Sequence, residues 1–269
     1  MTALATAYPT TWRRPPFIAD GRLRWALFVV AILYFVLAIG GLEINWGRIS
    51  EGLTRGWRFA AAFARPDFVS RWDDIAIGMQ ESLTMALTST AVGILLSIPI
   101  GIGAARNLAP RPVYLLCRAI VALSRSFQEI IIAILFVAMV GFGPFAGFLT
   151  LSLSTIGFLG KLLAEDIEDI DEAQAEAIRA TGASWLQLVN YGIQPQVMPR
   201  LIGLSLYRLD INFRESAVVG IVGAGGIGAT LNTALDRYEF DSAAAILLLI
   251  IAIVMLCEYG SSLVRRRIQ

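Results

Sequence analysis

The sequence has no histidine and only two cysteines among its 269 residues. Without histidine, the chain lacks the side chain that most often carries protons or binds metals near neutral pH. Cys117 and Cys257 lie far apart in apolar stretches, a spacing that forms neither a disulfide framework nor a zinc site. We therefore expect two buried thiols, and no metal or cofactor bound by this chain.

Charged residues are also scarce, at 16% of the chain against 57% hydrophobic residues, and the mean hydropathy is +0.67. A soluble domain of this length would carry more charge. The net charge is +1, so the basic surface of a nucleic-acid-binding protein is missing and no nucleic-acid partner is expected. The composition predicts an all-α protein that crosses a membrane several times and contacts lipid.

Apolar runs long enough to cross a bilayer, which needs about 20 residues, predict six spans. The uncharged run from Ile130 to Gly160 is too long for one span, and Gly141-Phe142-Gly143-Pro144 divides it between a third and a fourth. The six expected spans are Trp25–Leu42, Ser82–Ala105, about Val113 to Gly141, Pro144 to about Leu163, Arg200–Val222 and Ser242–Val264.

Arginines predict that both ends of the chain lie in the cytoplasm. Arg13 and Arg14 precede the first span, and Arg265 to Arg267 follow the last. The expected divisions are a cytoplasmic tail at 1–22, a first membrane helix with an extracytoplasmic amphipathic connection at 23–78, a transmembrane domain at 79–264 and a cytoplasmic tail at 265–269. Tryptophans suit the connection to the outer interface, although its arginines count against that side.

A polar loop at 165–199 separates the expected fourth and fifth spans. Acidic residues crowd its first turns and Arg179 lies near the end of the first helix, as the helix dipole favours. Gly182 offers a left-handed cap, and Ser184 with Gln187 forms a capping-box pattern that begins a second short helix. We expect Gln194-Pro195 to end that second helix, because the residue before a proline avoids the helical region.

This loop resembles the cytoplasmic "EAA" loop of the permease subunits of bacterial ABC importers. The residues that carry the resemblance are Glu176, Ala177, Gly182, Ala183, Ser184 and Pro195. Ile178, Gly192 and Gln194 depart from the residues usual in that loop. The resemblance implies that the loop couples this chain to a separate ATPase, which would hold ATP and magnesium. The chain itself would then have no catalytic residue and would not be an enzyme.

Charged side chains inside the expected spans are a second set of candidates, because a charge at mid-membrane costs about 3 kcal/mol and normally faces a cavity or another charge. Arg125 and Glu129 are spaced for an ion pair on one helix face. The fifth span carries a larger polar group: Arg208, Asp210, Asn212, Arg214, Glu215 and Ser216. These groups either line a path or form internal salt bridges, such as Arg214 with Asp210.

Gly223 to Gly228 matches the G-x-G-x-x-G fingerprint of dinucleotide-binding proteins. That fingerprint requires a preceding strand in a βαβ unit. Because the flanking segments are expected membrane helices, we interpret these glycines as a backbone break or a close helix contact.

Three segments in this order resemble the phosphonate-import permease family: 137–160, 176–199 and 207–228. The likeness extends over about 80–264. It implies the type I ABC importer permease fold in the bacterial inner membrane, with a homodimer of this chain, two cytoplasmic ATPase subunits and an extracytoplasmic substrate-binding protein. By position, Asn212, Arg214 and Ser216 would line a path for phosphonate, phosphite or phosphate.

Two other functions stay open from the sequence, an ion-driven secondary carrier and a membrane scaffold subunit. A secondary carrier would lack the coupling loop and would be expected to show internal repeats, and no repeat stands out here.

Overall fold

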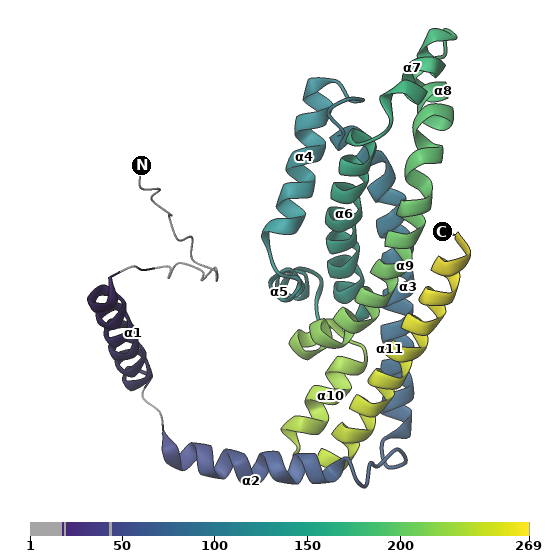
Figure 1. Cartoon of the computed structure of the whole chain (residues 1–269). Coiled ribbons are helices and arrows are strands. Elements are labelled where there is room, and N and C mark those ends of the chain that lie inside the picture. The colour runs from purple at the N-terminus through teal and green to yellow at the C-terminus, as the bar shows by residue number, and fades with distance from the viewer. Residues whose placement is uncertain (1–17, 19, 43–44, 269) are drawn as a thin grey trace, which may run out of the picture. The chain divides into compact units, whose positions relative to one another are not determined.

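The computed structural model describes residue 18, residues 20–42 and residues 45–268 (Figure 1). These residues contain helices and turns and no strand, which agrees with the expected all-α class. The chain divides into two compact units, Met1–Gly56 and Trp57–Gln269. The expected cytoplasmic tail at 1–22 falls almost wholly outside the described residues, as does the last residue of the tail at 265–269.

The first unit contains α1 (Gly21–Gly40). Its N-terminus is capped by Asp20, whose carboxylate accepts a hydrogen bond from the backbone N–H of Arg22 at 2.9 Å. The helix is apolar on all sides and its residues are exposed, as a helix surrounded by lipid would be. Its 20 residues match the thickness of a bilayer core at about 1.5 Å per residue. Helix α2 (Trp46–Ala62) follows and crosses the boundary between the units.

The core of the second unit is formed by α3 (Trp72–Ala104), α6 (Pro144–Glu168) and α9 (Gln194–Val219). Small residues bring the helices close together: a Cβ atom added at Gly101 of α3 would lie 2.8 Å from Leu163 of α6. Helix α3 begins earlier than the expected span Ser82–Ala105, because Ile75 is buried against Ile227 and Leu231. The first helical turns of α3 therefore belong to the bundle.

The expected third span is not one helix. Helix α4 (Arg111–Ser126) and helix α5 (Glu129–Val140) are bent by 97° relative to one another. The bend lies at Phe127 and Gln128, whose backbones are both extended. The expected break before α6 is confirmed, since Gly141 and Gly143 have φ angles of 92° and 132°.

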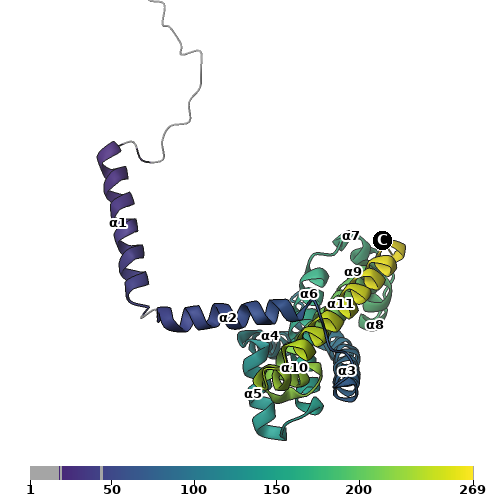
Figure 2. The ribbon, with the colours of Figure 1, turned by 90° about the horizontal axis from the view of Figure 1, so that it is seen from below.

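The last helices of the bundle are α10 (Ile227–Asp236) and α11 (Phe240–Ile268), and α11 packs along α9 (Figures 1 and 2). Between α9 and α10 a π-helical turn at Gly220–Ala224 ends in a backbone break, with positive φ at Gly223, Gly225 and Gly226. A Cβ atom at Gly220 would lie 2.8 Å from the Cα of Gly228. The glycine-rich segment is thus both a helix break and a close helix contact, and a helix precedes it where a nucleotide-binding fingerprint needs a strand.

Four helices of the described residues are long and apolar enough to cross a membrane: α1, α3, α6 and α11. Two bent pairs pass the same test together, namely α4 with α5, and Trp185–Ala224 with α10, which are bent by 58°. If each bent pair forms one span, the total is six, the number expected from the sequence.

Candidate functional site

The candidate coupling loop folds as two helices joined by a sharp elbow. Helix α7 (Glu172–Ala180) is capped by Asp171, which accepts a hydrogen bond from the N–H of Ala173 at 3.0 Å. Gly182 follows α7 with a φ angle of 79°, and its N–H donates to the carbonyl of Arg179 at 3.0 Å. The N–H of Ser184 donates to the side chain of Gln187 at 2.7 Å and begins α8 (Trp185–Gln187). The predicted left-handed glycine and this bond of the capping box are therefore present.

Pro195 does not end the second helix, so that prediction is wrong. A π-helical turn at Leu188–Ile193 follows α8, and α9 continues directly from it at Gln194. The N–H of Gln194 bonds to the carbonyl of Val189 in the wide pattern of a π-helix. Because this turn shifts the hydrogen-bond register just before Pro195, the proline falls in the first turn of α9, where its missing N–H is tolerated.

The elbow lies at one end of the bundle, where α3 ends and α4 begins (Figure 1). It exposes apolar side chains there. Trp185, Leu186 and Tyr191 have exposed fractions of 50%, 65% and 70%. Glu176 and Ala177 lie on the exposed surface of α7, while Ala183 is half-buried. Exposed apolar groups on a polar loop are typical of a protein-binding surface. We name Trp185, Leu186 and Tyr191 the elbow patch.

The elbow is packed firmly onto the helices behind it. Ala175, Leu188 and Ile193 are buried in one cluster with Leu163 and Ile167 of α6. Two polar contacts add to this packing: the N–H of Asp171 bonds to Gln196 at 3.0 Å, and Arg200 pairs with Asp166 at 3.0 Å. A displacement of the elbow would therefore be passed directly to α6 and α9.

Gly192, one of the departures from the usual loop, has a packing role in this cluster. A Cβ atom there would lie 3.2 Å from Leu188 and 3.6 Å from the Cα of Ala175. The glycine therefore lets α7 approach the π-helical turn closely.

The candidate path residues do not converge within one chain. Asn212 is fully buried and donates to the hydroxyls of Thr90 and Thr155 at 2.8 and 2.9 Å. Ser216 is also fully buried and donates to the carbonyl of Phe213 on its own helix. The side chain of Arg214 is instead 50% exposed. This divergence follows from a spacing of two, which turns the helix face by roughly 200°.

Arg214 forms an ion pair with Asp210, the alternative to a path role that the sequence left open. Its Nη2 atom donates to Oδ2 of Asp210 at 2.6 Å, one helical turn earlier. The other oxygen of Asp210 is buried and has no hydrogen-bond partner among the described residues. The pair holds the half-exposed side chain of Arg214 on the exposed face of α9.

The ion pair that the spacing of Arg125 and Glu129 allows does not form, because the two residues lie on either side of the bend between α4 and α5. Glu129 lies in the first turn of α5 and accepts a hydrogen bond from Ser154 of α6 at 2.6 Å. The ion pairs of the described residues include Glu129 with Arg208, at 3.8 Å, and none with Arg125. Glu129 does pair with an arginine, but that arginine is Arg208 of α9.

Arg208, which the sequence offered as a charge of the fifth span without placing it on the path, forms an internal salt bridge. It is 3% exposed, donates to the hydroxyls of Ser154 and Thr155 at 2.6 and 3.1 Å, and lies over the ring of Phe158 at 5.5 Å. The adjacent hydroxyls of Ser154 and Thr155 inside an expected span were the available signal for a buried cation.

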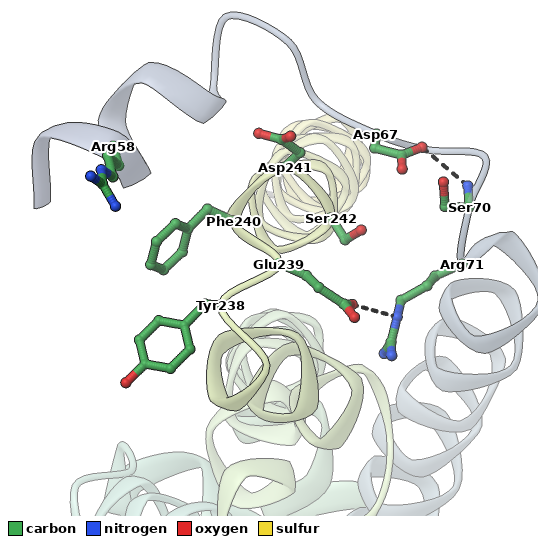
Figure 3. Close-up of a pocket in the computed structure, with 9 residues that line it drawn as sticks. All are labelled: Arg58, Asp67, Ser70, Arg71, Tyr238, Glu239, Phe240, Asp241 and Ser242. Carbon is green, nitrogen blue, oxygen red and sulfur yellow. Dashed lines mark hydrogen bonds and ion pairs between the residues drawn. The ribbon is translucent and has the colours of Figure 1, made fainter. Parts of the chain in front are cut away.

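A cavity of about 560 Å³ lies at the other end of the bundle, where α3 and α11 begin (Figure 3). It is lined by Arg58, Asp67, Ser70, Arg71, Tyr238, Glu239, Phe240, Asp241 and Ser242. Arg71 pairs with Glu239 at 2.7 Å. Hydrogen bonds from the Ser70 side chain and from the N–H groups of Ser70 and Val69 lower the pKa of Asp67. Internal partners thus satisfy much of the charge in this cavity.

The chain matches the family model described as "Binding-protein-dependent transport system inner membrane component" over residues 97–269. It is 36% identical to the putative phosphite transport system permease protein HtxC of Stutzerimonas stutzeri, over 92% of this chain and 88% of that protein. It is 41% identical to the phosphate-import permease protein PhnE of Mycolicibacterium smegmatis, over 76% of this chain. The match spans 38% of that longer relative.

Solved structures of ABC transporters share the fold. The inward-facing MetNI methionine ABC transporter superposes with a TM-score of 0.64 at 24% identity, covering 73% of this chain and 96% of that chain. A bacterial alginate ABC transporter, solved with its pentasaccharide-bound periplasmic protein, gives a TM-score of 0.59 at 17% identity, covering 91% and 94%. At these identities the likeness concerns the fold alone, and it confirms the fold expected from the sequence.

Proposed function

This chain belongs to the family of binding-protein-dependent transport system inner membrane components, and on that premise we propose that it is the permease subunit of an ATP-driven importer of a phosphorus oxyanion. The observation that carries the proposal is the elbow at Gly182, which presents the elbow patch at one end of the bundle. A carrier that works alone would have no use for such a surface.

The elbow patch is suited to a cytoplasmic ATPase subunit. Trp185 and Leu186 are large apolar side chains held on a rigid turn, the kind of group that anchors a protein interface. Gly182 has open space around it, so a partner surface can approach the backbone closely. ATP and magnesium would be held by that partner, and Glu176, Ala177, Ala183, Ser184 and Pro195 would shape or border the docking surface.

Force from the ATPase would reach the membrane through the cluster that joins α7, the π-helical turn and α6. Since Leu188 and Ile193 are buried against Leu163 and Ile167, closing of the ATPases would tilt α6 and α9 together. Two copies of this chain, both with cytoplasmic termini, would form a pathway between them that opens alternately to each side. An extracytoplasmic binding protein would deliver the substrate.

The substrate class follows from the relatives, which are named for phosphate and phosphite. A shorter relative, the putative cryptic phosphonate transport system permease protein PhnE2 of Escherichia coli K12, is 48% identical over 44% of this chain and 97% of its own length. All three substrates present phosphoryl oxygens, which a guanidinium binds in a fork geometry. Arg214, half exposed and oriented by Asp210, is the group on α9 that we assign to this contact.

Purification of the complex from native membranes tests this function. The chain should co-purify with an ABC ATPase identified by mass spectrometry, and the complex should hydrolyse ATP. The variant Trp185→Ala/Leu186→Ala should lose the ATPase, whereas the exposed control Leu123→Ala on α4 should keep it. A chain that transports its substrate with an ion gradient and no ATPase would be a secondary carrier. Retention of the ATPase by the double variant would show that the elbow patch is not the docking surface.

A further inference from the structure

Helix α2 has two faces of opposite chemistry. Ile49, Leu53 and Trp57 follow one another at intervals of four residues and therefore share one face. Arg55 lies on the opposite side of the helix, because it is two positions from both Leu53 and Trp57 and is turned from them by roughly 200°. Arg48 precedes Ile49 and Arg58 follows Trp57, each turned by roughly 100° away from the apolar row. The helix contains three arginines and one glutamate, Glu51, which pairs with Arg55 at 3.5 Å.

The apolar face of α2 is exposed. The exposed fractions of Ile49, Leu53 and Trp57 are 42%, 71% and 77%. From Trp57 on, α2 is part of the second unit, and a different face packs there: Phe59 lies against the rings of Phe63 and Phe240. Because Phe59 lies about 160° around the helix from Trp57, this packing leaves the apolar face open.

We propose that α2 lies flat in the phospholipid surface on the extracytoplasmic side of the membrane, with Ile49, Leu53 and Trp57 among the upper acyl chains and Arg48, Arg55 and Arg58 at the level of the lipid phosphates. A strongly two-faced helix with tryptophan and leucine on one side and arginines on the other is the pattern of interfacial helices. In addition, α2 lies between two candidate membrane spans in the sequence, α1 before it and α3 after it. Arginine side chains reach from such a position to the phosphates.

This location accounts for an anomaly in the sequence. Arginines near membrane spans are normally cytoplasmic, yet the order of the spans puts these arginines outside. Bound to lipid phosphates, they hold the connection at the surface instead of opposing the orientation. The proposal does not depend on what the chain transports or on an ATPase.

Spin labels on the full chain test the orientation of α2. Leu53→Cys and Arg55→Cys, each in a Cys117→Ser/Cys257→Ser background, would be labelled with a nitroxide and reconstituted into phosphatidylethanolamine/phosphatidylglycerol vesicles. Oxygen collects in the acyl region, whereas a nickel chelate stays in water. The oxygen-to-nickel accessibility ratio should be severalfold higher at position 53 than at position 55. Equal ratios would overturn the proposal, and so would dipolar broadening between labels at position 53, which would indicate contact between two copies.

The contribution of the arginines has its own test. In the Leu53→Cys labelled protein, Arg48→Gln/Arg58→Gln should lower the accessibility ratio at position 53, because the helix loses its contacts with the phosphates. Thr54→Gln, an exposed and uncharged position on the same helix, is the matched control and should leave the ratio unchanged. An unchanged ratio in the arginine variant would show that contacts with the lipid phosphates do not hold the helix in place. An equal decrease in the arginine variant and in Thr54→Gln would show that the decrease does not come from the loss of charge.

Discussion

Arg208 and Glu129 are joined through one hydroxyl group. The Nη2 atom of Arg208 lies 3.8 Å from Oε1 of Glu129, and the hydroxyl of Ser154 accepts from Arg208 and donates to Glu129, each at 2.6 Å. The three residues come from α9, α6 and α5. This contact attaches the start of α5, just after the 97° bend, to α6 and α9. Residues from the second half of the chain therefore help to hold the direction of α5.

Removing Arg208 is expected to destabilise the protein strongly. Arg208→Met removes the cation that pairs with Glu129 and donates to Ser154, and breaking a buried pair in this way costs about 3–5 kcal/mol. Arg125→Met, at an exposed arginine just before the bend, is the matched control and should change stability by at most about 0.5 kcal/mol. Thermal unfolding in detergent measures both, and equal melting temperatures for the two variants would contradict the role assigned to Arg208.

The elbow at Gly182 is expected to depend on backbone conformation. A β-branched residue with positive φ costs about 1–2 kcal/mol, whereas asparagine tolerates this region. Gly182→Val should therefore uncouple or release the ATPase, and Gly182→Asn should keep more of its activity, while both remain in the membrane. ATP hydrolysis by the purified complex measures the difference. Normal hydrolysis in Gly182→Val would reduce Gly182 to an ordinary loop residue.

Arg214 is expected to contact the transported anion. Arg214→Lys keeps the charge but loses the fork of donors, so uptake should fall roughly tenfold or more. Arg214→Ala should abolish uptake without loss of the dimer or the ATPase. If Asp210→Asn restored uptake to Arg214→Ala, the function of Arg214 would be limited to its salt bridge with Asp210.

Cysteine labelling is expected to place the start of α2 and the elbow on opposite sides of the membrane. In a Cys117→Ser/Cys257→Ser background, an impermeant maleimide added outside should label Ser50→Cys and should fail to label Ser184→Cys until the membrane is opened. Both positions are exposed, so access depends on the side of the membrane. The reverse pattern would invert the proposed orientation.

The sequence predicted the elements whose signals are local. Gly182 and Ser184 act on their own helix ends, so their capping roles could be read from neighbouring residues. The bend at Phe127 and Gln128 has neither glycine nor proline to signal it, and it depends on Glu129 reaching Ser154. Such contacts between distant segments are absent from local patterns.

Pro195 shows the same limit in another way. The residue before a proline usually avoids the helical region, which predicted a helix end at Gln194. The π-helical turn before Pro195 shifts the hydrogen bonds, so the proline lies in the first turn of α9 without breaking the helix. That turn packs against Ala175 and α6, so its geometry is set by tertiary contacts. The faces of Asn212 and Ser216 were in part foreseeable, because helical periodicity separates both from Arg214.

Uptake into vesicles tests the central claim most directly. Vesicles containing this chain and its ATPase, with ATP inside or outside and the binding protein present, would be supplied with phosphate, phosphite, a phosphonate or sulfate. The account predicts uptake of at least one phosphorus oxyanion over sulfate, only with ATP on the ATPase side and not in Gly182→Val. Uptake that proceeds without ATP, or equally well in Gly182→Val, would contradict it.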